Sequence, residues 1–127
     1  MAKVVLDTSA LLAFVSEERG GETVADVIAD AVISTVNVAE AVTKLVDRGA
    51  SLDRAREVLA IAEYEIADFD RQQAEQTGAL IARTRQRGLS LGDRACLALA
   101  QREGLPALTA DRRWAEIDIG VEVRLFR

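Results

Sequence analysis

The chain has 127 residues, a single cysteine, no histidine and a net charge of −5. Because this length is typical of one domain, we expect residues 1–127 to form a single domain with its own core. The lack of histidine excludes Ser-His-Asp and Cys-His catalytic triads and removes the commonest zinc ligand. The negative charge disfavours a protein that simply coats DNA or RNA, but it does not exclude a nuclease whose acidic site is filled by cations.

The composition also bears on the compartment. The single Cys96 lies in an apolar helical run and cannot form an internal disulfide, which is compatible with a reducing cytosol. No apolar stretch approaches the length of a membrane helix. Asp7 interrupts the N-terminal apolar run before a secretory signal could form. We therefore expect a cytoplasmic protein with no membrane partner.

Strands and helices alternate along the chain. The first strand, Val4–Leu6, is a run of three apolar residues typical of a strand that is buried on both faces. The other predicted elements are, in chain order, a helix over Ala10–Val15, a helix over Glu22–Asp30, a strand over Ala31–Ser34, helices over Val38–Arg48 and Leu52–Ala62, a strand over Tyr64–Ala67, helices over Asp70–Arg87 and Leu91–Glu103, and strands over Ala107–Thr109 and Val121–Phe126. This alternation predicts an α/β fold with a parallel sheet covered on both faces.

Two aspartates follow predicted strands. Asp7 comes directly after the first strand, and Asp111 comes two residues after the strand Ala107–Thr109. Open α/β sheets bind ligands at the carboxyl ends of their strands, so the two carboxylates are candidates for one site. Each also has a simpler interpretation. Asp7 is a favourable N-cap for the next helix, and Asp111 is an ordinary turn residue.

Two further acidic candidates lie on predicted helices. Asp93 is in the first turn of the helix Leu91–Glu103, which is apolar almost all round, so its carboxylate is costly unless it is paired or coordinated. Ser90 and Asp93 also match a capping box, and both interpretations can hold together. Glu40 falls on the polar face of its predicted helix, and Asn37 with Glu40 matches another capping box. Spacing alone therefore favours a solvated Glu40.

The segments that carry these acids resemble the PIN-domain family, and more narrowly the VapC-type ribonuclease toxins of bacterial toxin–antitoxin pairs. The segments are Val-Val-Leu-Asp-Thr-Ser-Ala-Leu-Leu-Ala at 4–13, Val-Asn-Val-Ala-Glu at 36–40, Leu-Ser-Leu-Gly-Asp-Arg-Ala-Cys-Leu-Ala-Leu-Ala at 89–100 and Leu-Thr-Ala-Asp-Arg-Arg-Trp at 108–114. The last two segments are specific, the first is moderately so, and the segment at 36–40 gains weight only from its position. The resemblance covers essentially the whole chain.

The resemblance implies a three-layer α/β/α sandwich around a central parallel sheet of about five strands. It implies endonucleolytic cleavage of RNA, a small antitoxin protein that covers the acidic groove, and a homodimer. The acidic quartet that would bind Mg²⁺ or Mn²⁺ and carry out catalysis corresponds to Asp7, Glu40, Asp93 and Asp111. The hydroxyl positions that would support these acids correspond to Ser9 and Thr109.

A reaction hypothesis follows from this match. Divalent cations held by the carboxylates would neutralise the phosphodiester and lower the pKa of a bound water. Asp7 would be the central ligand, Asp93 and Asp111 would complete the coordination, and Glu40 would bind metal or orient the water. Among the basic residues near these acids, the candidates for contacts with RNA phosphates are Arg94, Arg112 and Arg113.

Two other classes of function stay open at this point. A non-catalytic interaction module on the same fold would use every carboxylate as a helix cap or a turn residue. A receiver-like phosphoacceptor would use Asp7 with Mg²⁺, but it needs a lysine near the strand ends, and the chain has only Lys3 and Lys44. The surroundings of Asp93 separate the nuclease from the module. Asp93 either pairs locally, for example with Arg94, or faces a shared cleft with Asp7.

Overall fold

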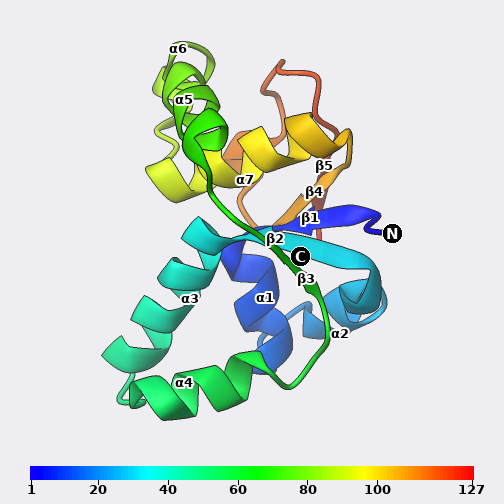
Figure 1. Cartoon of the computed structure of the whole chain (residues 1–127). Coiled ribbons are helices and arrows are strands. Elements are labelled where there is room, and N and C mark those ends of the chain that lie inside the picture. The colour runs from blue at the N-terminus through cyan, green and yellow to red at the C-terminus, as the bar shows by residue number, and fades with distance from the viewer.

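A five-stranded parallel sheet forms the centre of the computed structural model, which describes residues 1–127 (Figure 1). Its strands are β1 (Val4–Leu6), β2 (Ala31–Ser34), β3 (Glu65–Ala67), β4 (Ala107–Thr109) and β5 (Val123–Leu125). The spatial order is β3-β2-β1-β4-β5, so β1 is the central strand. Register pairs Leu6 with Ile33 on one side and with Leu108 on the other. The carboxyl ends of β1, β2 and β4 therefore meet at one edge of the sheet.

Helices cover both faces of the sheet, which confirms the predicted three-layer α/β/α sandwich (Figure 1). One layer holds α1 (Thr8–Val15), α2 (Gly21–Ala25), α3 (Thr35–Asp47) and α4 (Leu52–Leu59). The opposite layer holds α5 (Arg71–Ala79), α6 (Ile81–Thr84) and α7 (Leu91–Glu103). None of these helices combines the length and apolar character that crossing a bilayer would require.

The alternating side chains of β1 divide the core in two. Val4 and Leu6 belong to a cluster packed against α1 and α3, whereas Val5 belongs to the cluster around α7. All three are at most 3% exposed, as the apolar run predicts for a strand buried on both faces. Cys96 is also buried, in the α7 cluster. Asp7 thus follows a strand that packing holds rigidly from both sides.

The structure corrects several predicted helix boundaries. The segment Glu22–Asp30 is not one helix, because α2 ends at Ala25 and a separate 3-10 turn spans Ile28–Asp30. The predicted helix Asp70–Arg87 is likewise divided into α5, α6 and a 3-10 turn over Arg85–Arg87. Helix α4 ends at Leu59, three residues before the predicted end.

The most consequential correction concerns α3. The sequence predicts that it begins near Val38, but it begins at Thr35, and its N-cap is Ser34 at the end of β2. Asn37 is therefore inside the helix and does not cap it. Because Asn37 and Glu40 are three residues apart in a helix, their side chains share a face. This shift changes the environment of Glu40.

Candidate active site

A polar pocket of about 380 Å³ opens where the carboxyl ends of β1 and β4 meet the first turns of α3 and α7. All four predicted acids line it, although they come from four separate segments of the chain. The full lining is Asp7, Thr8, Ser9, Asn37, Glu40, Lys44, Ser90, Asp93, Ala110, Asp111 and Arg113. The structure thus brings together the acids that the sequence places far apart.

Asp7 is the most buried of the four, with 6% of its surface exposed. It caps α1, since its Oδ1 accepts a hydrogen bond from the Ala10 backbone N–H at 2.9 Å. Burial raises the pKa of Asp7 to about 6, a rise that hydrogen bonds to Thr109, Ser9 and Ala10 partly offset. The capping role and a place in the pocket therefore coexist in one residue.

Two hydroxyl groups hold the Asp7 carboxylate. Ser9 Oγ donates to Oδ1 at 2.7 Å, and Thr109 Oγ1 donates to Oδ2 at 2.5 Å. The same hydroxyls also accept from the next loop, Ser9 from the Ala110 N–H and Thr109 from the Asp111 N–H. The two side chains therefore join the ends of β1 and β4 and fix the backbone that carries Asp111.

Glu40 lines the pocket, as the family resemblance implies and contrary to the solvated side chain that spacing alone favours. Its Oε1 accepts from Thr8 Oγ1 at 2.5 Å and from Asn37 Nδ2 at 2.8 Å. Asn37 is 1% exposed and also donates to the Gly92 carbonyl at 3.1 Å, so it ties α3 to α7. A Cβ atom at Gly92 would lie 2.2 Å from Glu40 Oε2. Glycine is required there because the carboxylate occupies the space of a side chain.

Asp93 both caps α7 and lines the pocket, so the two interpretations of its sequence position hold together. The capping box is present, since Ser90 Oγ accepts from the Asp93 N–H and Asp93 Oδ2 accepts from the Ser90 N–H. Burial raises the pKa of Asp93, and the charges of Asp111 and Glu40 raise it further. Arg94 is not its partner, because that guanidinium turns away and donates to the Thr77 carbonyl at 3.0 Å.

Asp111 forms a close ion pair with Arg113. The Arg113 guanidinium donates from Nε and Nη2 to the two Asp111 oxygens, with a shortest distance of 2.6 Å. These hydrogen bonds hold the pKa of Asp111 below its usual range. The loop is anchored by Trp114, which is fully buried in the α7 cluster. Asp111 therefore has the closest cationic partner of the four acids, and the same guanidinium lies 3.8 Å from Asp93 Oδ2.

The donor set suits a hard divalent cation, since it consists of carboxylate oxygens in one pocket. The fit depends on the rearrangement of some side chains, because no group of three or more acidic or thiol side chains is arranged to hold a metal ion as it stands. The protein's own donors take up several of the oxygens: Thr8 and Asn37 on Glu40, Ser90 on Asp93, and Arg113 on Asp111. Burial raises the pKa of Asp7 and Asp93, and neighbouring carboxylates add a smaller rise, so a bound cation would compensate negative charge that is costly to bury.

Comparison with known proteins decides the family. Residues 4–120 match the PIN domain. The chain belongs to the PIN domain family. This is a family of nucleases, and the match spans all four acids of the pocket. No curated protein of similar sequence was found.

Solved structures share the fold of this PIN domain. DNA-bound VapBC from Salmonella typhimurium is 22% identical with a TM-score of 0.78, and all of both chains is covered. VapBC-5 from Mycobacterium tuberculosis is 25% identical with a TM-score of 0.64, and 100% of this chain and 99% of that chain are covered. VapC20 from the same organism, described as a toxin that cleaves the sarcin-ricin loop, is 18% identical with a TM-score of 0.71 over 94% and 99%.

Sequence reasoning missed four contributors to the pocket of this PIN domain. Thr8 and Asn37 hold Glu40, Gly92 leaves room for it, and Lys44 lines the rim. The spacing of Asn37 and Glu40 could have indicated their contact, because they are three positions apart. The predicted helix begins too late, at Val38, so Asn37 falls at its cap position. Nothing in the sequence marks Gly92, because a glycine in a first helical turn is unremarkable without its neighbour across the pocket.

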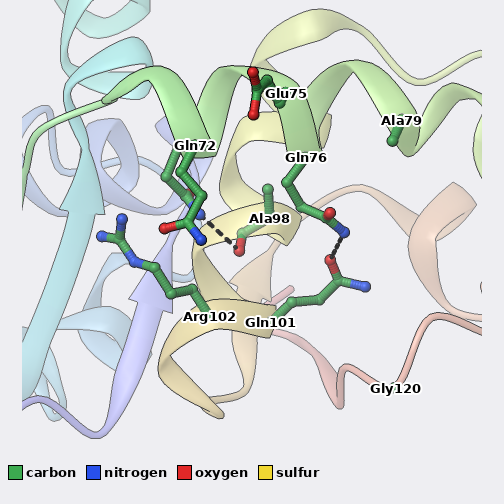
Figure 2. Close-up of a pocket in the computed structure, with 9 residues that line it drawn as sticks. Gln72, Glu75, Gln76, Ala79, Ala98, Gln101, Arg102 and Gly120 are labelled. Carbon is green, nitrogen blue, oxygen red and sulfur yellow. Dashed lines mark hydrogen bonds between the residues drawn. The ribbon is translucent and has the colours of Figure 1, made fainter.

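A second polar pocket, of about 620 Å³, lies between α5 and α7 (Figure 2). Its amides mostly bond within the protein. Gln76 Nε2 donates to Gln101 Oε1 at 2.8 Å, and Gln101 Nε2 donates to the Ile119 carbonyl at 2.9 Å. Buried Gln73 donates from Nε2 to the Ala98 carbonyl at 3.5 Å. This pocket has Glu75 as its one carboxylate, and we assign its amides to the packing of the two helices.

Replacing Thr109 with valine should destabilise the fold most at neutral pH. The variant removes a fully buried hydroxyl that donates to Asp7, and we expect a loss of about 1–3 kcal/mol when Asp7 is charged. The loss should shrink near pH 4.5, where Asp7 is mostly protonated. Urea unfolding at both pH values measures this. Thr43→Val, which removes an exposed hydroxyl from α3, is the control, and an equal loss in both variants would contradict the assignment.

Proposed function

We propose that this PIN domain is a Mg²⁺- or Mn²⁺-dependent endoribonuclease and the toxin component of a type II toxin–antitoxin pair. The observation that carries the proposal is the convergence of Asp7, Glu40, Asp93 and Asp111 on one pocket, with Asp7 buried at the end of the central strand. Membership of a nuclease family and the fold shared with VapC proteins support it. The choice of RNA over DNA as substrate rests on the family resemblance and on the likeness to VapC20, which is described as a toxin that cleaves the sarcin-ricin loop.

The roles of the acids follow from their surroundings. We assign Asp7, Asp93 and Asp111 to holding the metal, and Ser9 and Thr109 to fixing Asp7. A bound divalent cation would neutralise the phosphodiester and make an attacking water more acidic. Rigid support matters because a metal site needs its ligands held in place by neighbouring hydrogen bonds.

Glu40 has a different arrangement, and we assign it to the attacking water. Both hydrogen bonds from Thr8 and Asn37 go to Oε1, which leaves Oε2 without a hydrogen-bond donor from the chain. Oε2 is thus the atom available to orient a water and accept its proton. The hydrogen bonds on Oε1 keep the carboxylate from rotating away from the pocket.

Positive charge near the pocket would meet the RNA backbone. Lys44 and Arg113 line the pocket, and Arg112 is exposed beside Asp111. We assign phosphate contacts to Lys44 and Arg112. The other two predicted contacts are not part of the proposal, because the Arg94 guanidinium is partly buried against the Thr77 carbonyl and that of Arg113 is bonded to Asp111.

A protein partner is part of the proposal. The VapBC neighbours are toxin–antitoxin complexes, and on this basis we propose an antitoxin partner and a homodimer for this chain. The surface offers an apolar groove between α3 and α4, lined by Val38, Val42, Leu52, Arg56, Leu59, Ala60, Ala62, Glu63, Tyr64 and Ile66. Leu52 and Ile66 are about half exposed there, at 50% and 53%. Apolar patches of this kind mark protein interfaces, and we assign this one to the antitoxin, in addition to the acidic groove that the resemblance implies it covers.

Cleavage of RNA by the purified, antitoxin-free protein tests the proposal. We expect cleavage of single-stranded or structured RNA with Mg²⁺ or Mn²⁺, none with EDTA, and none with a folded Asp7→Asn variant. Hydrolysis by water should leave 5′-phosphate and 3′-hydroxyl ends. Products with 2′,3′-cyclic phosphate, or cleavage that persists in EDTA, would contradict the mechanism. A folded protein that neither cleaves RNA nor binds metal would instead be an interaction module whose acids serve as caps.

A further inference from the structure

Arg113 makes an unusual set of contacts within the pocket. Its guanidinium bonds both Asp111 oxygens, and its Nη2 lies 3.8 Å from Asp93 Oδ2. Its Nη1 donates to the Gly88 carbonyl at 3.1 Å, on the loop before α7. One positively charged group thus joins two of the four acids and is fixed from a third direction by backbone.

This guanidinium occupies carboxylate oxygens that a metal ion would need. A carboxylate bonded in a bidentate way by arginine offers the same two oxygens that a cation would coordinate. The guanidinium also supplies positive charge between Asp93 and Asp111, whose like charges would otherwise repel each other. While Arg113 is bonded to Asp111 and lies beside Asp93, it therefore competes with a cation for their carboxylate oxygens.

The ion pair between Arg113 and Asp111 is weak enough for a cation to compete with it. The Arg113 side chain is 54% exposed and that of Asp111 is 24% exposed, so water screens the pair. Exposed ion pairs of this kind contribute little to stability. A divalent cation carries twice the charge of a guanidinium and suits carboxylate oxygens, so it can displace the side chain.

We infer that Arg113 is a built-in competitor of the divalent cation, a positioning residue that holds Asp93 and Asp111 in the metal-free protein and lowers the affinity for metal. The inference rests on the proposed metal-dependent function of the same pocket. On this account the guanidinium must leave Asp111 before a cation can bind there. The metal affinity of this chain is then set partly by one arginine that follows Asp111 by two residues.

The neighbouring Arg112 provides a matched control. Arg112 is exposed, and its guanidinium donates from Nη2 to the Arg127 carbonyl at 3.5 Å, outside the acidic pocket. Arg112→Gln removes the same charge from the adjacent position without freeing any of the four acids. A general effect of net charge on metal binding would appear in both Arg112→Gln and Arg113→Gln. Competition for Asp111 would appear in Arg113→Gln alone.

Mn²⁺ affinity, measured by calorimetry on the metal-free protein, tests the inference. Arg113→Gln should bind Mn²⁺ roughly fivefold to tenfold more tightly than the wild type, and Arg112→Gln should change affinity by less than about twofold. Arg113→Lys, which keeps the charge but loses the planar fork, should lie between the wild type and Arg113→Gln. If Arg113→Gln does not fold, tighter binding by Arg113→Lys than by the wild type is the deciding result.

The outcomes separate this inference from the proposed function. If the wild type binds Mn²⁺ and the Arg113 variants bind it equally or more weakly, the competition is wrong and the metal site stands. If neither the wild type nor the Arg113 variants bind Mn²⁺, both the inference and the metal-dependent function are wrong. Tighter binding by both glutamine variants would show a general charge effect and would also overturn the inference.

Discussion

Asp7→Asn is expected to abolish RNA cleavage and, at the same time, to stabilise the metal-free protein at neutral pH. Asp7 is 6% exposed, and burial raises its pKa from 3.8 to about 6. Asparagine keeps the size and can still accept from the Ala10 N–H, but it carries no charge that must be buried. Both effects have the same cause. The negative charge of Asp7 would bind the metal, but burying that charge destabilises the metal-free protein.

The sign of the pH dependence follows from the raised pKa. The folded protein holds the Asp7 proton more tightly than the unfolded chain does, so Asp7 makes folding less favourable as the pH rises from about 4 to about 6. The difference between 3.8 and about 6 corresponds to roughly 3 kcal/mol above both values. We expect Asp7→Asn to recover about 1–2 kcal/mol, because its amide cannot accept from the Thr109 hydroxyl as the carboxylate does.

Urea unfolding in EDTA, as a function of pH, measures this effect. The gain in Asp7→Asn should be present near pH 7 and should vanish near pH 4, where Asp7 is neutral in the wild type. Asp70→Asn is the matched control, since Asp70 caps α5 in the same way but its side chain is 54% exposed. A destabilised Asp7→Asn at pH 7, or a gain that persists at pH 4, would contradict the account of a buried, metal-ready charge.

Gly92→Ala is expected to impair cleavage while leaving the fold nearly as stable. A Cβ at this position would lie 2.2 Å from Oε2 and 2.4 Å from Cδ of Glu40. Those atoms are the end of a flexible side chain, so the alanine can be accommodated by moving Glu40 away from Thr8 and Asn37. We expect kcat/KM to fall by about 10²-fold, in the range typical of losing a general base.

Two variants isolate the cause. Gly78→Ala, inside α5, places a Cβ where nothing lies within 4 Å, and it should leave cleavage unchanged and stabilise the helix by about 0.5–1 kcal/mol. In a Glu40→Ala background, Gly92→Ala should cause no further loss of cleavage and should become stabilising by a similar amount. Additive losses in the double variant would show that Gly92 acts on something other than Glu40.

The strand-end acids could be predicted because local signals agree with the global fold. The run Val4–Leu6 identifies a central strand, and Ala107–Thr109 lies beside it in the sheet. Asp7 and Asp111 are therefore placed at one edge by topology alone. For Asp93, the capping box and the cleft proved compatible, because the first turn of α7 points toward the same edge.

Residue spacing alone could not give the surroundings of Glu40 and Arg113, for two different physical reasons. Helical periodicity locates the face of a residue only when the start of the helix is known, and α3 begins at Thr35, three residues earlier than the apolar pattern suggests. Arg113 follows Asp111 in a 3-10 turn fixed by buried Trp114. The direction of its side chain depends on the Gly88 carbonyl, which a distant part of the chain supplies.

The central claim is that Asp7, Asp93 and Asp111 hold a divalent cation in the pocket that Glu40 also lines. The most direct test is an anomalous difference map from crystals of this protein soaked in Mn²⁺. We predict a peak in the acidic pocket, coordinated by Asp7 together with Asp93 or Asp111, with the Arg113 guanidinium withdrawn from Asp111. A pocket without an anomalous peak at saturating Mn²⁺, with Arg113 still bonded to Asp111, would contradict the account. Asp7, Asp93 and Asp111 would then be helix caps only, and Glu40 a hydrogen-bond acceptor within the fold.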